Sequence, residues 1–249
     1  MSEFRAAPGR LGVVVLVSIA LLLIVTSCTV RDEMLLRPDG SGEVYVSVDM
    51  HPVLMAYFTD LMMAMTGAEG DLPIFDLDVL SASLSERPGV TLVSAETPER
   101  GSLRLHVRFE DINQLFIDED SAETARFSSA GNRRELVVTL NRTSVNRFLG
   151  YAPEESNMLA DLLLPPEDGS LSSEDYRGEL EWAFEEYGTP DDVAHALDGA
   201  VIEVRITPDG RIVAQSGGSI VGDSVVFRIP VLELLTLDAE RVYSVTFTP

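Results

Sequence analysis

The sequence predicts an α+β protein in which a curved antiparallel sheet of about 8–10 strands packs with helices. Apolar and polar residues alternate in several short segments, as in 103–109, and this period is typical of strands with one buried face. Glycine, proline and aspartate residues separate these segments, as at 37–42. Apolar residues with helical spacing lie mainly in 52–66 and in 143–198. The second of these regions is therefore predicted to be a helical insertion before the last strands.

The first residues have the parts of an export signal. Two arginines precede an apolar stretch that runs from Leu11 to Thr26. This stretch is shorter than the roughly 20 residues of a membrane-spanning helix. It ends in small residues and then in Cys28, which is the only cysteine of the chain. We therefore expect residues 1–27 to be a signal peptide and residues 28–249 to form one domain.

The segment Val25-Thr26-Ser27-Cys28 resembles the lipobox of bacterial lipoproteins. The resemblance implies that the Cys28 thiol receives a diacylglyceryl group, that the bond before Cys28 is cut, and that the new N-terminus is acylated, for example with palmitate. Two or three acyl chains give a stable anchor, whereas one chain is marginal. The protein would then lie in the cell envelope, on the outer face of the cytoplasmic membrane or in the outer membrane. The alternative is an uncleaved anchor, or an ordinary signal peptide with an incidental cysteine.

The charge of the chain disfavours two classes of partner. Its formal net charge is −23, and every cationic side chain other than histidine is an arginine. Such a surface repels nucleic acids and anionic lipid headgroups. We therefore expect no nucleic-acid partner, and we expect the membrane to be held through acyl chains on Cys28.

The first half of the chain alternates strands and helices. Strands are predicted at 29–36 and 43–49, with little tether between the first of them and Cys28. Pro52 begins a helix that Gly67 ends, and Asp76 is placed to cap a second helix. Further strands are predicted at 90–94, 103–109, 124–129 and 135–140, with a short helix at 112–116. His106 belongs to the polar face of its strand, where a lone exposed histidine is expected.

The helix that begins at Pro52 is apolar over more than half of its circumference and is rich in methionine. A functional hypothesis is that it lines a cavity of a few hundred Å³ for an apolar ligand, since methionine adapts to irregular surfaces. The candidate lining residues are Met50, Leu54, Phe58 and Met62. The alternative, which the pattern favours, is a core helix packed on the sheet.

The second half begins with the predicted helical insertion. One helix is expected from Pro153, and two more follow the capping residues Ser172 and Thr189. Trp182, the only tryptophan, is expected to pack this helical layer against the rest of the domain. The final strands are predicted at 200–206, 211–215, 224–229 and 241–247, with a turn of helix at 230–235.

Several turn and packing motifs follow one another along the chain: Asp39-Gly40-Ser41-Gly42, Gly89-Val90, Phe109-Glu110-Asp111 with Leu115, and Asp209-Gly210. This order resembles the LppM-type lipoprotein domain known from mycobacteria and other bacteria. The resemblance is clearest from Val30 to about Leu140 and looser from Val201 to Phe247. It implies an α+β fold similar to lipid-binding folds and an envelope protein that binds lipid or glycolipid. The matching positions are structural, so no binding residue is carried over.

No catalytic, metal or cofactor motif stands out. The chain has no nucleophile elbow, P-loop or dinucleotide fingerprint, and its histidines, His51, His106 and His195, have no partner at metal-ligand spacing. We therefore expect no cofactor and no metal, and the first hypothesis is a non-enzymatic binding module for lipid or glycolipid. The alternative is a structural or assembly lipoprotein, which would present an exposed apolar patch to an envelope protein.

Overall fold

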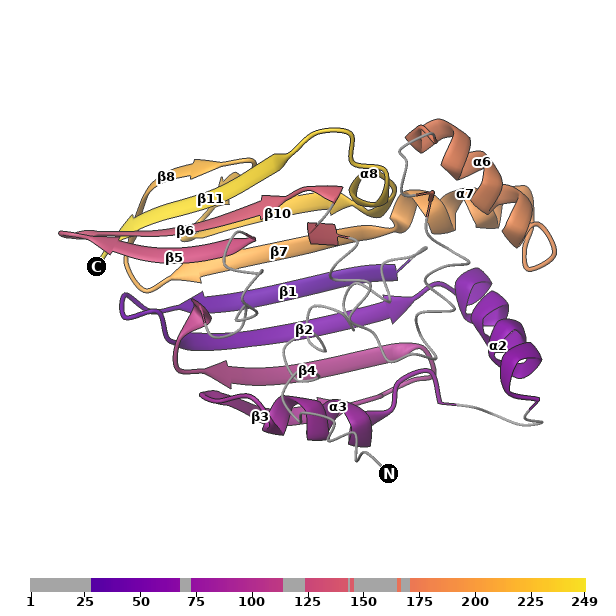
Figure 1. The fold of residues 1–249 in the computed structure, drawn as a ribbon, viewed down its shortest axis with the longest axis horizontal. Coiled ribbons are helices and arrows are strands. Elements are labelled where there is room, and N and C mark those ends of the chain that lie inside the picture. Colours follow the sequence, from indigo (N-terminus) through magenta and orange to yellow (C-terminus); the bar gives the residue numbers. More distant parts are fainter. Residues whose placement is uncertain (1–27, 68–72, 114–123, 143, 146–164, 167–170) are drawn as a thin grey trace, which may run out of the picture.

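The computed structural model describes residues 28–67, 73–113, 124–142, 144–145, 165–166 and 171–249 (Figure 1). They form two open sheets with helices, which confirms the predicted α+β class. The large sheet has seven strands in the order β3 (Val90–Glu96), β4 (Ser102–Phe109), β2 (Gly42–Met50), β1 (Cys28–Leu36), β7 (Val201–Pro208), β10 (Ser224–Pro230) and β9 (Ser219–Val221). The small sheet has four strands in the order β5 (Ala125–Ala130), β6 (Arg133–Leu140), β11 (Arg241–Thr248) and β8 (Arg211–Ser216).

The strands are therefore divided between two sheets, where the sequence suggested one. All but one of the described strand pairs run antiparallel, and four of them are hairpins of consecutive strands, as β1 and β2 are. The exception is β1, which pairs with β7 in parallel over 29–36 and 201–208. This parallel pair joins strands from the two ends of the chain at the middle of the large sheet (Figure 1).

The turn between β1 and β2 follows the chemistry of its residues. The Asp39 side chain accepts hydrogen bonds from the Ser41 backbone N–H at 2.9 Å and from the Ser41 hydroxyl at 2.7 Å. These bonds, the backbone one first, hold the pKa of Asp39 below its usual value. Gly40 between them has φ of 90°, which side chains with a Cβ rarely adopt. The turn predicted at 37–42 is thus confirmed, and Asp39, Gly40 and Ser41 form it.

The helices lie around the large sheet. α2 (Pro52–Thr66), α6 (Ser173–Phe184) and α7 (Pro190–Gly199) gather beyond one end of the strands, and α3 (Leu77–Ser85) lies along β3 (Figure 1). The short α8 (Val231–Leu235) connects β10 to β11. The predicted starts are confirmed by the hydrogen bond that the Asp175 N–H donates to the Ser172 hydroxyl and by a capping box between Thr189 and Asp192.

The prediction for Trp182 was wrong, because its side chain is 73% exposed. Tyr176, Leu180 and Phe184 are the buried residues of α6, and they recur every four positions. At about 100° per residue, Trp182 lies roughly 200° around the helix from Leu180, on the side away from the core. The predicted helix after Pro153 and most of the one at 112–116 lie outside the described residues.

Candidate functional site

The inner face of the large sheet is apolar except at one position. Paired residues form rows across β2, β1 and β7: Val48–Val30–Ile202, Val46–Asp32–Val204 and Val44–Met34–Ile206. The same face continues on β4 with Leu103, Leu105, Val107 and Phe109, and on β10 with Val225, Phe227 and Ile229. Among the described strand positions of this face, Asp32 is the only charged residue.

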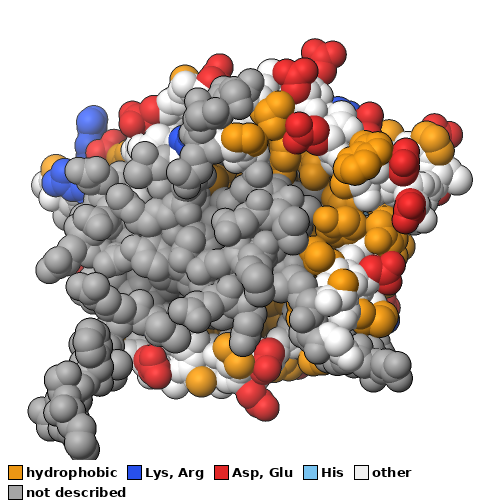
Figure 2. Space-filling view, turned by 45° about the vertical axis from the view of Figure 1, so that its right-hand side comes forward, with side chains coloured by type: hydrophobic (Ala, Val, Ile, Leu, Met, Phe, Trp, Pro, Cys, Tyr) orange, Lys and Arg blue, Asp and Glu red, His pale blue; other side chains and the backbone are white. Residues whose placement is uncertain are grey.

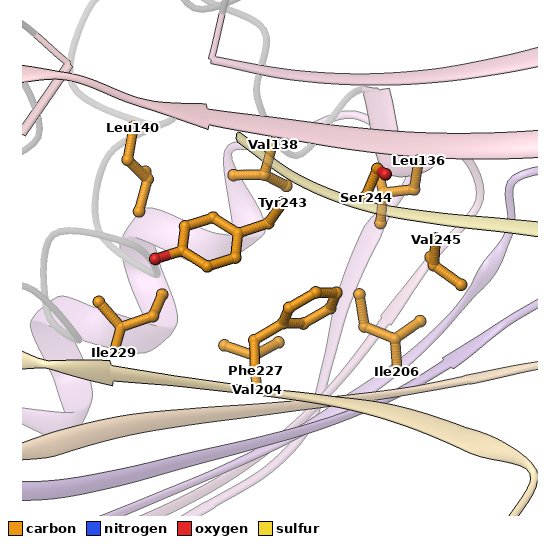
Figure 3. A pocket seen from close by; sticks show the side chains of 10 residues that line it. All are labelled: Leu136, Val138, Leu140, Val204, Ile206, Phe227, Ile229, Tyr243, Ser244 and Val245. Carbon is orange, nitrogen blue, oxygen red and sulfur yellow. The ribbon is translucent and has the colours of Figure 1, made fainter. Parts of the chain in front are cut away.

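An apolar cavity of about 60 Å³ lies between the two sheets. Two strands of the large sheet and two of the small sheet supply its lining: Val204 and Ile206 of β7, Phe227 and Ile229 of β10, Leu136, Val138 and Leu140 of β6, and Tyr243, Ser244 and Val245 of β11 (Figure 3). The alternation of each strand turns these side chains toward the opposite sheet, except that of Ser244, which lies between Tyr243 and Val245 and is out of phase with them. The cavity is therefore a product of the sheet-to-sheet contact.

Two aromatic rings meet across this cavity. Phe227 of the large sheet and Tyr243 of the small sheet have ring centroids 5.6 Å apart at an interplanar angle of 81° (Figure 3). This edge-to-face arrangement is favourable for aromatic pairs. No strand pairing joins the two sheets within the described part of the chain. Side-chain packing therefore holds them together along the cavity.

Asp32 lies one strand away from the cavity. It pairs in register with Val204, which lines the cavity, and with Val46 on its other side. Its Oδ1 atom is enclosed and has no hydrogen-bond partner. Burial raises the pKa of Asp32 from its usual 3.8 to about 7, because the apolar surroundings disfavour the charged form. The site thus combines an apolar cavity with a single enclosed carboxyl group.

The sequence contained a signal for Asp32 that our sequence analysis missed. Val30, Met34 and Leu36 occupy the same face of β1, and Asp32 falls between them at the same two-residue period. A carboxyl group in phase with buried residues is unusual, since aspartate is rarely buried without a partner. The signal was readable from the alternation alone.

The methionine-rich helix does not line this cavity. Leu54 is fully buried, and Met50 and Phe58 pack against the core. Met62 is half-buried on the same helix. None of the four belongs to the cavity between the sheets. A ligand-binding role for them stays a prediction, and the described site lies elsewhere.

The outer face of the large sheet carries a polar cluster. Glu43 accepts from His106 Nε2 at 2.8 Å, and Arg37 and Arg108 lie within 3.5 and 3.4 Å of its other oxygen. The His106 ring stacks on Tyr45 with centroids 4.1 Å apart. The hydrogen bond to His106, followed by the charge of Arg108, lowers the pKa of Glu43. His106 is therefore half-buried and partnered, in contrast to the exposed residue expected.

Two further features bear on the site. In the described ranges, no group of three or more histidine, cysteine, aspartate and glutamate residues is arranged to hold a metal ion. Among the helices described, none is both long and apolar enough to cross a bilayer.

The predicted lipidation residue, Cys28, is the first residue of β1, where its backbone pairs with Met50 just before α2.

Comparisons with known proteins gave one distant likeness. No family model and no curated protein matches the chain. The NMR structure of the folded domain of LppM from Mycobacterium tuberculosis aligns with a TM-score of 0.40 and 13% sequence identity, over 89% of this chain and 90% of that one. LppM gives its name to the family that the sequence motifs resemble. A likeness at this level does not establish membership, so the family assignment stays a prediction.

Proposed function

We propose that this protein is a lipid-anchored, non-enzymatic lipoprotein of the bacterial cell envelope that binds the apolar chain of a lipid or glycolipid between its two sheets. The observation that carries the proposal is the apolar cavity between the sheets, lined from both sides by four strands. Binding sites for small molecules are typically concave and mostly apolar, with few polar groups. Asp32, beside the cavity, supplies one such group.

The size of the cavity sets a condition on this function. About 60 Å³ is far below the roughly 300–1,000 Å³ of a typical ligand pocket. A lipid chain therefore enters only if the two sheets move apart. Such a movement breaks side-chain contacts but no strand ladder, because the described strands of the two sheets do not pair with each other. The contact between the sheets is thus the part of the molecule best suited to open.

Anchoring through Cys28 is the second part of the proposal. If Cys28 carries acyl chains, no linker separates them from the sheet, since β1 begins at that residue. The end of the large sheet that carries α2 and α7 then lies next to the bilayer (Figure 1). In the parent protein the N-terminal peptide should begin at Cys28 and carry the mass of the acyl groups, and replacing Cys28 with alanine should remove that mass. An N-terminal peptide of the parent protein without acyl mass would contradict lipid anchoring at Cys28.

Native mass spectrometry tests lipid binding directly. Residues 28–249 with Cys28→Ser are mixed with a bacterial phospholipid and glycolipid extract, and bound lipids are identified by mass. Val204→Phe fills the cavity and should reduce lipid adducts, whereas Val242→Phe on β11 is the matched control, because Val242 is 44% exposed and outside the cavity. Absence of adducts with the parent protein, or equal adducts with both variants, would contradict the proposal.

A second function is favoured by the surface of the helices. Trp182 exposes 73% of its side chain on α6, inside the region predicted to be an insertion. Figure 2 shows hydrophobic side chains among carboxylates on the right-hand part of the molecule, the side where Figure 1 places α2, α6 and α7. Tryptophan is enriched at protein interfaces. A structural or assembly role with an envelope protein would require Trp182, so Trp182→Ala should abolish co-purification of that partner while lipid adducts persist.

A further inference from the structure

We infer that Asp32 is the polar end of the lipid site, and that the ligand is an uncharged amphiphile whose hydroxyl group donates a hydrogen bond to Asp32. The inference rests on the proposed function, since it assumes that an apolar chain occupies the space between the sheets. It adds the chemistry of the headgroup. Three features of the large sheet carry it: the register of β1, the enclosure of Oδ1, and the absence of any other charged residue at the described strand positions of the inner face.

The register places Asp32 at the end of the cavity that faces β1. Asp32 pairs with Val204, and Val204 pairs with Phe227, so the three side chains lie in one row across β1, β7 and β10. Val204 and Phe227 both line the cavity. Adjacent strands are about 4.8 Å apart. A lipid chain that lies over Val204 and Phe227 therefore has the end nearest β1 about one strand spacing from Asp32.

The enclosed Oδ1 atom of Asp32 is an acceptor without a donor among the described contacts, and a ligand hydroxyl group could supply one. An enclosed acceptor oxygen without a hydrogen bond is unfavourable, and native structures satisfy most such atoms. The neighbours of Asp32 in its row are Val46 and Val204, and neither side chain can donate. A ligand that brings its own donor would satisfy Oδ1, and the apolar row on either side would hold its hydrocarbon part.

The surroundings also select the kind of donor. An anionic headgroup would meet the Asp32 carboxyl group and a chain of net charge −23. An ammonium group has three donors to satisfy, and beside Asp32 the only side-chain acceptor that the described cavity lining turns toward the opposite sheet is the hydroxyl of Tyr243. A hydroxyl group is uncharged and costs far less to enclose than an ammonium group, and Oδ1 can accept the hydrogen bond that it donates. The glycerol or sugar hydroxyl of an acylated, uncharged lipid fits this description.

Photocrosslinking of the full-length protein in detergent tests the inference. The probes are a monoacylglycerol with a diazirine in its acyl chain, the methyl ester of the same acid, which has no hydroxyl donor, and the corresponding alkylamine. Labelled peptides are identified by mass spectrometry, and β7 and β10 report on the cavity. We expect the monoacylglycerol to label these strands about tenfold more than the methyl ester or the amine. Removing the carboxyl group with Asp32→Val should reduce its labelling to the level of the ester.

Two further variants complete the test. Asp32→Asn keeps an acceptor oxygen, so labelling should stay within about threefold of the parent protein. Arg31→Val is the matched control, because Arg31 is the exposed neighbour on the outer face, and labelling should not change. Equal labelling by ester and monoacylglycerol, or stronger labelling by the amine, overturns the inference and leaves the proposed function intact. If no probe labels β7 or β10, both fail. The probe comparison needs no variant, so misfolding of Asp32→Val cannot mask the result.

Discussion

Removing the charge of Asp32 should change how the stability of the protein depends on pH. In the folded protein, burial raises the pKa of Asp32 to about 7, against 3.8 for an exposed aspartate. Below pH 3.8, Asp32 is protonated in both the folded and the unfolded states, and its burial carries no charge penalty. Between pH 3.8 and about 7, the unfolded chain releases the proton while the folded chain keeps it, so stability falls as pH rises. Above pH 7, the penalty is constant.

The size of this effect follows from the shift. Each pKa unit corresponds to about 1.4 kcal/mol, so the penalty above pH 7 is at most about 4 kcal/mol. It is an upper limit because only Oδ1 is shown to be enclosed, whereas the residue as a whole is partly exposed, so water screens part of the charge. Carboxyl groups such as Glu43, whose pKa is lowered, act in the opposite direction and lose stability as pH falls. Only the difference between parent and variant isolates Asp32.

Urea unfolding followed by circular dichroism measures that difference. Residues 28–249 with Cys28→Ser are compared with and without Asp32→Asn at pH 4.5 and pH 8. The variant should gain stability over the parent by about 1–4 kcal/mol more at pH 8 than at pH 4.5, because it has no charge to bury. An equal difference at the two pH values would refute the claim that Asp32 titrates in an enclosed site.

Three further substitutions and one matched control probe the fold itself by the same unfolding measurement. Gly42→Ala should cost about 2 kcal/mol or more, since a Cβ there would lie 2.1 Å from the carbonyl oxygen of Leu35; an unchanged midpoint would contradict that close approach. Gly178→Ala in α6 is its matched control and should add about 0.5–1 kcal/mol, because nothing lies within 4 Å of the new methyl group. Thr189→Ala should cost about 1 kcal/mol and speed amide exchange in the first turn of α7, because it removes the N-cap hydrogen bond; an unchanged exchange rate would contradict a role of this cap in stability. Phe227→Ala should cost about 3–5 kcal/mol, and a loss below 1 kcal/mol would mean that the sheets do not pack at Tyr243.

Local structure could be predicted because it depends on neighbours in the sequence. The helix at Pro52 ends at Gly67, whose φ of 63° and bond to the Met63 carbonyl form the expected C-cap. Capping at Ser172 and Thr189 was likewise readable from side chains three residues apart. The parallel pairing of β1 with β7 was not predictable, since alternation shows which face of a strand is buried but not which strand lies beside it.

The candidate site was harder to predict than the fold. The cavity arises from the spacing between two sheets. Its lining residues come from two strand pairs, β7 with β10 in the large sheet and β6 with β11 in the small sheet, and sequence alternation does not show that these pairs face each other. The sequence pointed to Met50, Leu54, Phe58 and Met62, in or next to α2, because a methionine-rich helix is conspicuous, whereas the cavity between the sheets is lined by ordinary strand residues such as Val204. Asp32 could have been identified from its phase in β1. That its Oδ1 atom is enclosed next to a cavity can be recognised only from the structure.

Because β1 pairs with β7, the large sheet cannot be completed until residues after 200 have been synthesised. Residues up to 140 contribute β1 to β4 to the large sheet and β5 and β6 to the small one, and residues from 201 onward supply all the remaining strands. Until that second part emerges, β1 and β6 each present an unpaired edge, and such edges promote aggregation. A partly synthesised chain that begins to fold therefore has two strand edges to protect while its last fifty or so residues follow. Truncation before β7 would leave both edges exposed permanently.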